Sequence, residues 1–191
     1  MFTGIITNLG EITNISISKL TVKTKKGFIG RLSKGDSVSL NGVCLSVSAL
    51  AKNSLAVDVM PETRHRTNLG EARVGDLVNM ELPLTPNSFL SGHIVQGHVD
   101  GVAKLENIKK RGNSRILRFS IPANLSKLLV EKGTITVNGI SLTVIEVKGN
   151  SFSVGIVPFT WGHTMLNKVK VGDKLNIEMD IIGKYVQKFV T

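Results

Sequence analysis

The sequence is poor in cysteine and aromatic residues and has no long apolar run. Its 191 residues include a single cysteine, Cys44, which excludes an internal disulfide and a cluster of metal-binding thiolates and fits a reducing cytosol. The first residues lack a basic segment followed by an apolar stretch, so no secretory signal is expected. No apolar run approaches the roughly 18 residues that a membrane-spanning helix needs. We therefore expect a soluble, cytoplasmic protein without membrane contact.

The charge is unbalanced, with 24 Lys and Arg against 14 Asp and Glu and a net charge of +10. This raises the question of nucleic acid. The basic residues are nevertheless dispersed, and the seven Phe, one Trp and one Tyr do not interleave with them as on a single-strand-binding surface. A nucleic-acid role is therefore disfavoured, and the alternatives are a solvated basic surface or one that attracts an anionic partner. Neither a G-x-G-x-x-G nor a P-loop motif occurs, so no nucleotide cofactor is indicated.

The second half of the chain repeats the first. The run NGVCLSV at residues 41–47 recurs as NGISLTV at 138–144, and 16 of the 42 positions from 41 to 82 are identical to those from 138 to 179. A tandem duplication of one small domain explains this match. Because a solenoid needs at least three repeats, two docked domains are the better interpretation.

Each copy has the pattern of β-structure. Short runs alternate between apolar and polar residues with period two, are rich in β-branched side chains and are separated by glycine-containing turns. Six such runs in each copy predict an all-β fold built from two closed, six-stranded antiparallel barrels. The predicted strands cover residues 4–12, 20–25, 36–40, 43–49, 54–60 and 77–82, and then 93–104, 115–121, 134–137, 140–147, 152–158 and 174–179.

The remaining segments predict short helices and a linker. Short helices are expected near residues 67–69, near the equivalent residue 164, over 123–130 and over 183–190. In the last of these, Tyr185, Val186 and Phe189 form an apolar stripe that should dock on a neighbouring surface. Two prolines make residues 83–88 a stiff linker. The predicted domains are an N-terminal barrel at 1–88, a C-terminal barrel at 89–182 and a C-terminal helix at 183–191.

The Asn41-Gly42 dipeptide between two alternating runs predicts a type I′ hairpin. A two-residue loop pairs Leu40 with Val43 and Ser39 with Cys44, which sorts the side chains onto an apolar and a polar face. Such a polar face suits a flat, hydrogen-bonding heterocycle with a polyol tail, although a β-face turned to solvent has a similar composition. Its members are Ser37, Ser39, Cys44 and Ser46 in the first copy and Thr134, Thr136, Ser141 and Thr143 in the second.

Two histidines lie five residues apart in a glycine-containing segment. On one continuous strand His93 and His98 fall on opposite faces, so a shared metal ion is not expected. The neighbouring glycines allow a ligand to approach the backbone closely. Asp100 either orients His98 or caps a turn, and a lone histidine is more commonly structural than catalytic. Cys44 is a candidate nucleophile, a hydrogen-bonding thiol or a small buried residue.

Taken together, four segments resemble the riboflavin synthase family, whose members carry two lumazine-binding domains. They are MFTGII at 1–6, NGVCLSV at 41–47, GHIVQGHVDG at 92–101 and NGISLTV at 138–144, and the resemblance spans essentially the whole chain. It implies Greek-key barrels that each bind one lumazine. It also implies a homotrimer joined by the C-terminal helix, in which the N-terminal barrel of one subunit faces the C-terminal barrel of another, and an association with lumazine synthase.

The resemblance implies a dismutation of two molecules of 6,7-dimethyl-8-ribityllumazine. One molecule donates a four-carbon unit to the other, which yields riboflavin and 5-amino-6-ribitylamino-uracil in the last step of riboflavin biosynthesis. No metal and no organic cofactor are implied, because the acidic C7 methyl group of the substrate supplies the carbanion. Two similar, facing sites suit a reaction between two copies of one molecule, in which proximity and orientation are the main gain.

The resemblance also implies site residues at matching positions. Ser37 and Cys44 would deliver or activate the nucleophile that adds at C7 of the donor, and His98 and Thr143 would transfer protons at the methyl groups. The expected catalytic residues are Ser37, Cys44, His98, Thr143 and Asp180. Expected contacts of the N-terminal site are Gly4, Ile5, Ile6, Cys44, Leu45, Ser46, Asp58, Val59, Met60, Pro61, Glu62 and Thr63, and Phe2 and Thr3 are also expected to bind the substrate. Those of the C-terminal site are Gly97, His98, Val99, Lys132, Ser141, Leu142, Thr143, Gly155, Ile156, Val157, Pro158, Phe159 and Thr160.

The alternative within the resemblance is a lumazine- or flavin-binding protein without catalysis, such as the antenna proteins of luminous bacteria. The presence of Cys44, His98, Ser141 and Thr143 favours the enzyme. The two copies differ where donor and acceptor roles would differ. These differences are Cys44 against Ser141, Ser46 against Thr143, Asp58 against Gly155, and Glu62 against Phe159.

Overall fold

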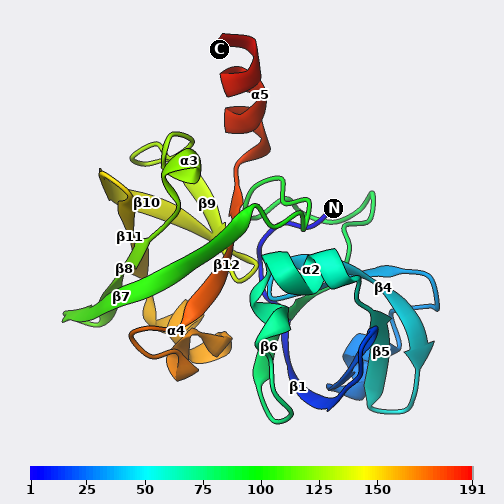
Figure 1. Cartoon of the computed structure of the whole chain (residues 1–191). Helices are drawn as coiled ribbons and strands as arrows, with labels where there is room; N and C mark the ends of the chain where they lie inside the picture. The colour runs from blue at the N-terminus through cyan, green and yellow to red at the C-terminus, as the bar shows by residue number, and fades with distance from the viewer. Residues whose placement is uncertain (191) are drawn as a thin grey trace.

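The structure, a computed structural model, describes residues 1–190 and contains two β-barrels packed side by side (Figure 1). The N-terminal barrel consists of β1 (Asn8–Ile15), β2 (Lys19–Lys23), β3 (Ser37–Leu40), β4 (Val43–Leu50), β5 (Ser54–Asp58) and β6 (Leu77–Glu81). The C-terminal barrel consists of β7 (Gly101–Arg111), β8 (Ser114–Ser120), β9 (Thr134–Val137), β10 (Ile140–Lys148), β11 (Ser151–Ile156) and β12 (Lys174–Met179).

Both barrels are closed and have the same topology. The strand orders are β1-β2-β5-β4-β3-β6 and β10-β11-β8-β7-β12-β9, which the duplication makes equivalent. The paired strands are antiparallel, so the predicted all-β fold of two Greek-key barrels is confirmed. Even the β-bulges recur, since the register of β4 shifts between Val47 and Ala49 and that of β10 between Val144 and Glu146. A bulge bends and twists a strand, which a small closed barrel requires.

The apolar face of each hairpin lies inside its barrel. Val38, Leu40 and Leu45 belong to the N-terminal core, and Ile135, Val137 and Leu142 to the C-terminal core, as the period-two pattern predicts. The two clusters are separate, so each barrel has its own small core.

Short helices connect the strands. They are α1 (Lys26–Ile29), α2 (Pro61–Arg66), the 3-10 helix η1 (Asn68–Gly70), α3 (Ala123–Ser126), α4 (Pro158–His163), the 3-10 helix η2 (Met165–Lys168) and α5 (Ile181–Val190). The predicted strands at 54–60 and 152–158 are too long, because Pro61 and Pro158 open α2 and α4 in their first turns. The helix predicted over 123–130 ends at Ser126, where the backbone changes to i to i+3 bonds such as Leu128 N–H to Leu125 C=O.

Two strand predictions begin too early. The strand predicted over 4–12 begins at Asn8, and the one predicted over 93–104 begins at Gly101. Before β7 the chain makes only an isolated bridge, between Val95 and Phe2. Gly4 and Gly97 explain the difference, because their positive φ angles of 78° and 79° interrupt the extended backbone.

The two hairpin turns meet at the centre of the molecule. Asn41 and Gly42 have φ angles of 47° and 79°, and Asn138 and Gly139 have 45° and 77°, which confirms the predicted type I′ turns. A Cβ atom on Gly42 would lie 2.7 Å from the backbone nitrogen of Gly139, and a Cβ atom on Gly139 would lie 2.7 Å from that of Gly42. Only glycine permits this contact between the barrels.

Buried asparagines complete the interface between the barrels. The side-chain amide of Asn79 donates to the carbonyl of Asn138 (2.9 Å), and that of Asn176 donates to the carbonyl of Asn41 (2.8 Å). Removing one partner of a buried hydrogen bond leaves an unsatisfied polar group, so these reciprocal pairs specify how the barrels dock.

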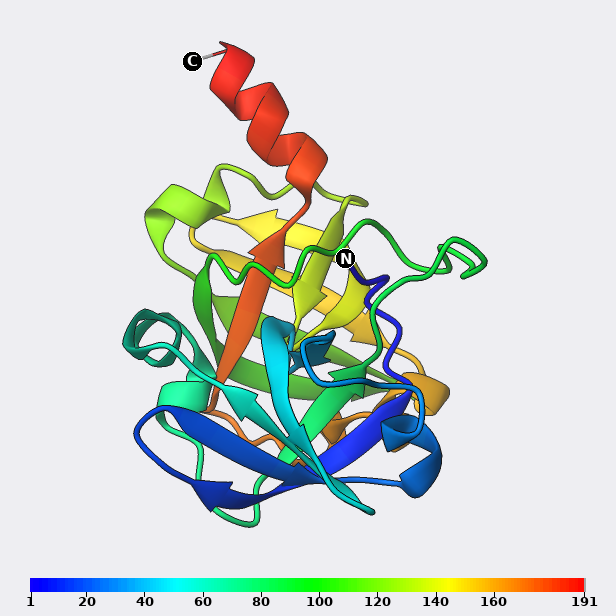
Figure 2. The same cartoon turned by 90° about the vertical axis from the view of Figure 1, so that its right-hand side faces the viewer.

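Helix α5 leaves the C-terminal barrel and projects away from both barrels (Figures 1 and 2). Its apolar side chains Ile182, Tyr185, Val186 and Phe189 are exposed, so the predicted stripe does not dock within the described part of the chain. Among residues 1–190, no helix is long and apolar enough to cross a membrane.

Candidate ligand sites on the two barrels

The two hairpins present the polar faces that the sequence predicts. Strands β3 and β4 pair Ser39 with Cys44, and β9 and β10 pair Thr136 with Ser141. In each pair the first residue is buried and the second is half-buried. The same register pairs Ser37 with Ser46 and Thr134 with Thr143.

The N-terminal segment of the chain docks on the C-terminal barrel. The carbonyl of Gly4 accepts a hydrogen bond from the backbone N–H of Ser141 (2.8 Å), and Ile6 packs against the C-terminal core. A Cβ atom on Gly4 would lie 2.6 Å from the Cβ of Ser141. Only glycine therefore fits between the segment and the polar face of this barrel.

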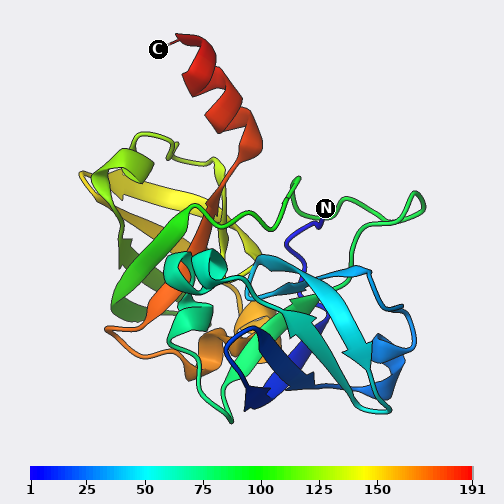
Figure 3. The ribbon, with the colours of Figure 1, turned by 45° about the vertical axis from the view of Figure 1, so that its right-hand side comes forward.

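The equivalent segment of the second copy docks on the N-terminal barrel. The carbonyl of Gly97 accepts from the backbone N–H of Cys44 (2.9 Å), and Val99 packs against the N-terminal core. A Cβ atom on Gly97 would lie 2.6 Å from the Cβ of Cys44. Between the two docked segments, Phe2 and Val95 exchange two backbone hydrogen bonds of 2.7 and 3.1 Å. Figure 3 shows the N-terminus between the two barrels.

Because each segment docks on the barrel of the other copy, the expected grouping of the site residues is corrected. Residues 4–6 lie beside Ser141 rather than Cys44, and residues 97–99 lie beside Cys44 rather than Ser141. The period of a strand shows which side chains share a face, but not which barrel the preceding segment joins. His98, the exposed residue after Gly97, therefore belongs with the Cys44 face.

His93 belongs to the Ser141 face, which the sequence does not reveal. Its Nδ1 lies 2.7 Å from the hydroxyl of Ser141 and its Nε2 lies 3.2 Å from that of Thr136. Burial lowers the pKa of His93, and the nearby Asp180 carboxylate partly opposes this effect. The imidazole is therefore favoured in its neutral form. In the sequence, only its spacing of five residues from His98 drew attention to His93, and that spacing did not identify Ser141 or Thr136 as its partners.

Two expected catalytic residues of the C-terminal barrel lie at one end of its polar face. Thr143 pairs across the strands with Thr134, whose hydroxyl donates to the carboxylate of Asp180 in a short hydrogen bond. Close to this end, Lys132 has a φ angle of +66°, although it is not a glycine. The equivalent residue in the first copy is Gly35, at +95°.

Helices α2 and α4 overlap the expected binding runs 58–63 and 155–160, and their exposed side chains differ in chemistry. In α2, Glu62 forms a short ion pair with Arg66, which lowers the pKa of Glu62. At the same spacing in α4, Phe159 stacks on His163 with ring centroids 4.0 Å apart. One barrel thus has an exposed charged pair where the other has an exposed aromatic pair.

Several expected contacts have their side chains in the cores. Such residues can reach a ligand only through their backbone. They are Phe2, Leu45, Val59, Leu142 and Ile156, each less than 9% exposed. Other expected residues are exposed or half-buried: Ile5, Ser46, Asp58, Met60, Pro61, Glu62, Thr63, Lys132, Gly155, Val157, Pro158, Phe159 and Thr160.

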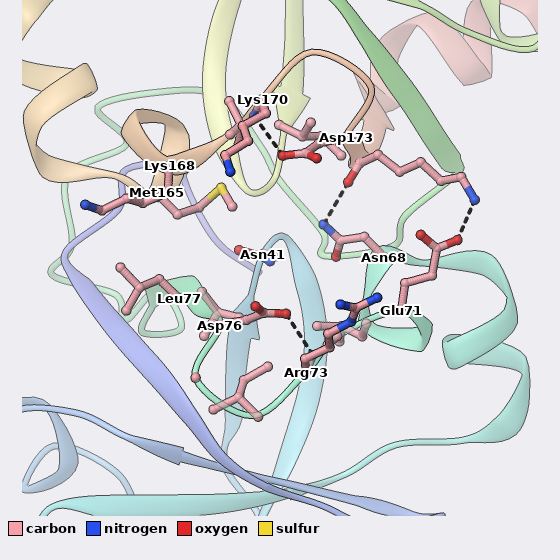
Figure 4. A pocket seen from close by; sticks show the side chains of 18 residues that line it. Asn41, Asn68, Glu71, Arg73, Asp76, Leu77, Met165, Lys168, Lys170 and Asp173 are labelled. Atoms are coloured by element: carbon pink, nitrogen blue, oxygen red, sulfur yellow. Dashed lines mark hydrogen bonds and ion pairs between the residues drawn. The ribbon is translucent and has the colours of Figure 1, made fainter.

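A cavity of about 740 Å³ lies between the barrels, at η1, η2 and the turns before β6 and β12 (Figure 4). Its lining includes Arg73, Lys168 and Lys170 together with Asp76 and Asp173. None of the expected site residues lines it, so it is distinct from the polar faces. Among residues 1–190, no group of three or more His, Cys, Asp or Glu side chains is placed to hold a metal ion.

Comparison with known proteins defines the class first. The lumazine binding domain family matches the chain twice, over residues 3–83 and 96–180, so the chain is a protein with two lumazine-binding domains. Over its full length it is 39% identical to riboflavin synthase of Actinobacillus pleuropneumoniae and 38% identical to that of Bacillus subtilis, of which it covers 90% each. It is also 38% identical to riboflavin synthase of Mycobacterium tuberculosis, of which it covers 98%. The chain belongs to the riboflavin synthase family.

Solved structures share the fold. The chain matches LumP complexed with 6,7-dimethyl-8-(1'-D-ribityl) lumazine with a TM-score of 0.85 and LumP complexed with riboflavin with a TM-score of 0.88. The sequence identities are 23% and 24%, and the matches cover 94% of this chain and 99% of each LumP chain. At this identity the likeness concerns the arrangement of the barrels.

Proposed function

We propose that the protein is a riboflavin synthase that converts two molecules of 6,7-dimethyl-8-ribityllumazine into riboflavin and 5-amino-6-ribitylamino-uracil. One molecule transfers a four-carbon unit to the other, in the last step of riboflavin biosynthesis, without a cofactor. The observation that carries the proposal is the pair of matched polar faces on one scaffold. They have the same register but different chemistry, with Cys44 in one and Ser141 with His93 in the other. A reaction between donor and acceptor copies of one substrate needs such a pair.

The proposed catalytic roles are assigned according to which segment docks on each polar face. Ser37 and Cys44 deliver or activate the nucleophile that adds at C7 of the donor, and His98, held beside Cys44 by Gly97, transfers a proton at a methyl group. At the other face, Thr143 is the second proton-transfer residue, and Asp180 orients it through Thr134.

The remaining expected residues are proposed to bind the heterocycle and the ribityl chain. They are the runs 58–63 and 155–160, together with Thr3–Ile6 beside Ser141 and Gly97–Val99 beside Cys44. Lys132 supports this proposal, because a non-glycine residue at φ +66° is strained by about 1–3 kcal/mol, and such strain concentrates at functional sites.

The test is incubation of the purified protein with 6,7-dimethyl-8-ribityllumazine while riboflavin absorbance is recorded. Formation of riboflavin without added cofactor is the expected result. If lumazine neither binds nor reacts, the proposal is wrong.

A second candidate is a lumazine- or flavin-binding protein without catalysis. The fold match to LumP, solved with lumazine and with riboflavin, favours it. Tight binding of lumazine with no turnover in the same assay would establish this candidate instead.

We propose a homotrimer in which α5 joins the subunits. The exposed apolar side chains of α5, with Phe189 at 80% and Val190 at 76% exposure, support an intermolecular contact. In this trimer the N-terminal barrel of one subunit faces the C-terminal barrel of another, so that the active site forms between chains. Deleting residues 181–191 should yield monomers in sedimentation analysis, whereas an unchanged mass would exclude this role for α5. An association with lumazine synthase is a further proposal, which co-sedimentation of the two proteins tests.

A further inference from the structure

The last strand of each barrel carries a buried glutamate at or next to its final residue. Glu81 is the last residue of β6 and is 4% exposed. Its carboxylate accepts hydrogen bonds from the backbone N–H groups of Thr3 (2.6 Å) and Gly4 (3.0 Å) and from the hydroxyl of Thr3 (2.7 Å). The N-terminal segment, which docks on the C-terminal barrel, is therefore also held by the N-terminal barrel.

Glu178 has the equivalent position in β12 and is 3% exposed. Its carboxylate accepts from the backbone N–H groups of Gln96 (2.7 Å) and Gly97 (2.9 Å). The contact recurs although the two docked segments are identical at only one position, which is Gly4 in the first copy and Gly97 in the second. Because this contact between the glutamate and the docked segment occurs in both copies, it is a structural feature of the repeated domain.

Each glycine is thus bonded on both sides. The N–H of Gly97 binds Glu178 of the C-terminal barrel, and its carbonyl binds Cys44 of the N-terminal barrel. Gly4 makes the mirrored connection, from Glu81 to Ser141. A single glycine residue therefore joins the carboxylate of one barrel to the polar face of the other.

We infer that Glu81 and Glu178 are positioning residues that act across the barrels, each on the ligand site of the opposite barrel. Glu178 fixes the segment that carries His98 beside Cys44, and Glu81 fixes Thr3–Ile6 beside Ser141. The effect on catalysis rests on the proposed function, whereas the effect on the geometry of the two faces does not.

The contact requires two acceptor oxygens on one side chain. Two N–H donors converge on one side chain, and a carboxylate has an acceptor oxygen for each. Glutamine has nearly the same size but turns one NH2 group toward a donor. Burial raises the pKa of Glu81 and raises that of Glu178 to about 7, which the backbone N–H groups only partly oppose. Burying a charge at this position is unfavourable, so a role in filling space would be served better by an apolar residue.

The only cysteine of the sequence, Cys44, reports on the proposed effect of Glu178. Cys44 is half-buried and its backbone is bonded to Gly97. We would measure its alkylation by iodoacetamide, an uncharged reagent, in the full-length protein, in E178Q and in E81Q. E178Q should raise the rate about tenfold through loosening of the segment, and E81Q should change it less than about twofold. Equal rates in all three proteins, or an equal rise in both variants, would overturn the inference.

The only tryptophan of the sequence, Trp161, reports on the proposed effect of Glu81. Trp161 lies in α4 of the C-terminal barrel, next to the expected contacts Phe159 and Thr160. Quenching of its fluorescence by 6,7-dimethyl-8-ribityllumazine should require about tenfold more ligand in E81Q and be nearly unchanged in E178Q. The reverse order of the two variants would contradict the crossed arrangement. If lumazine neither quenches Trp161 nor reacts in the wild-type protein, the proposed function fails, and the alkylation experiment still decides on the positioning residues.

Hydrogen exchange of the wild-type protein provides a test that needs no variant. The amides of Thr3, Gly4, Gln96 and Gly97 lie outside the strands but should exchange at least about tenfold more slowly than exposed loop amides. Exchange as fast as that of the exposed Asn87 amide in the linker would overturn the inference, even if both variants fail to fold.

Discussion

The two barrels have one scaffold and two different faces. Positions that close a barrel or dock it on the other recur, such as the Asn-Gly turns and the buried Asn79 and Asn176. Positions at the polar faces and in helices α2 and α4 diverge, with Cys44 replaced by Ser141 and Glu62 by Phe159. The duplication therefore preserved the architecture while the two faces diverged, which the proposed donor and acceptor roles would require.

The faces also differ in their histidines. His98 is exposed beside Cys44, whereas His93 is half-buried between Ser141 and Thr136. His98 is proposed to transfer a proton at one face, and the neutral His93 is hydrogen-bonded at the other. Each of the following predictions compares one barrel with the other.

The largest effect is expected for Gly97→Ala. The new Cβ would lie 2.6 Å from the Cβ of Cys44, so the segment must leave this face and take His98 with it. Riboflavin formation should fall about 1000-fold. Gly75→Ala is the control, because Gly75 has a φ of +95° and no atom within 4 Å of a Cβ. It imposes backbone strain without a collision and should keep most of the activity; equal losses in both variants would show that the contact with Cys44 is irrelevant.

The next effect is a pH dependence of stability that Glu178 contributes. Its pKa is about 7 in the folded protein, above the value of 4.5 expected when unfolded, so its contribution is present below about pH 4.5 and is lost as the pH rises through 7. The free energy of unfolding of the wild type relative to E178Q should fall by up to about 3 kcal/mol from pH 5 to pH 8. Lys184 lowers and Asp100 raises the pKa of this carboxyl. Urea denaturation of both proteins measures the difference, and parallel pH profiles would refute the assignment.

His98→Ala should lower turnover about 100-fold and the affinity for lumazine much less, because the imidazole is proposed to transfer a proton. His93→Ala should mainly weaken binding, since it removes the partner of two hydroxyls at the other face. Steady-state kinetics combined with equilibrium titration separates the two effects. Equal losses of turnover and affinity in the His98 variant would show that His98 only binds the substrate and does not transfer a proton.

The smallest effect is expected for Lys132→Gly. The second copy would then have the residue that the first copy has at Gly35, and the strain at φ +66° would be relieved. The free energy of unfolding should rise by about 0.5–1 kcal/mol, while lumazine binding weakens. Gly35→Lys is the reciprocal variant and should be destabilised. A loss of stability in Lys132→Gly would mean that the lysine side chain itself stabilises the fold.

The sequence was sufficient to predict the barrels and the hairpin register. The pairing of Ser39 with Cys44 follows from the Asn-Gly turn and the period of two, both of which are local properties. The strands at 54–60 and 152–158 were extended too far, because a proline at the first position of a six-residue helix resembles a break after a strand.

The composition of each site could not be predicted in the same way. Gly4 and Gly97 cross to opposite barrels through contacts with Ser141 and Cys44, which are distant in sequence and leave no periodic pattern. His93, Glu81 and Glu178 were missed for the same reason, since their importance lies in partners from other parts of the chain. The resemblance supplied most of the expected site residues but grouped residues 4–6 and 97–99 with the wrong barrels.

The most direct test of the account is the stoichiometry of turnover. Lumazine consumed and products formed are quantified by chromatography after incubation with the purified protein. The account predicts one riboflavin and one 5-amino-6-ribitylamino-uracil for every two molecules of 6,7-dimethyl-8-ribityllumazine consumed. Lumazine that is bound but recovered unchanged would contradict it.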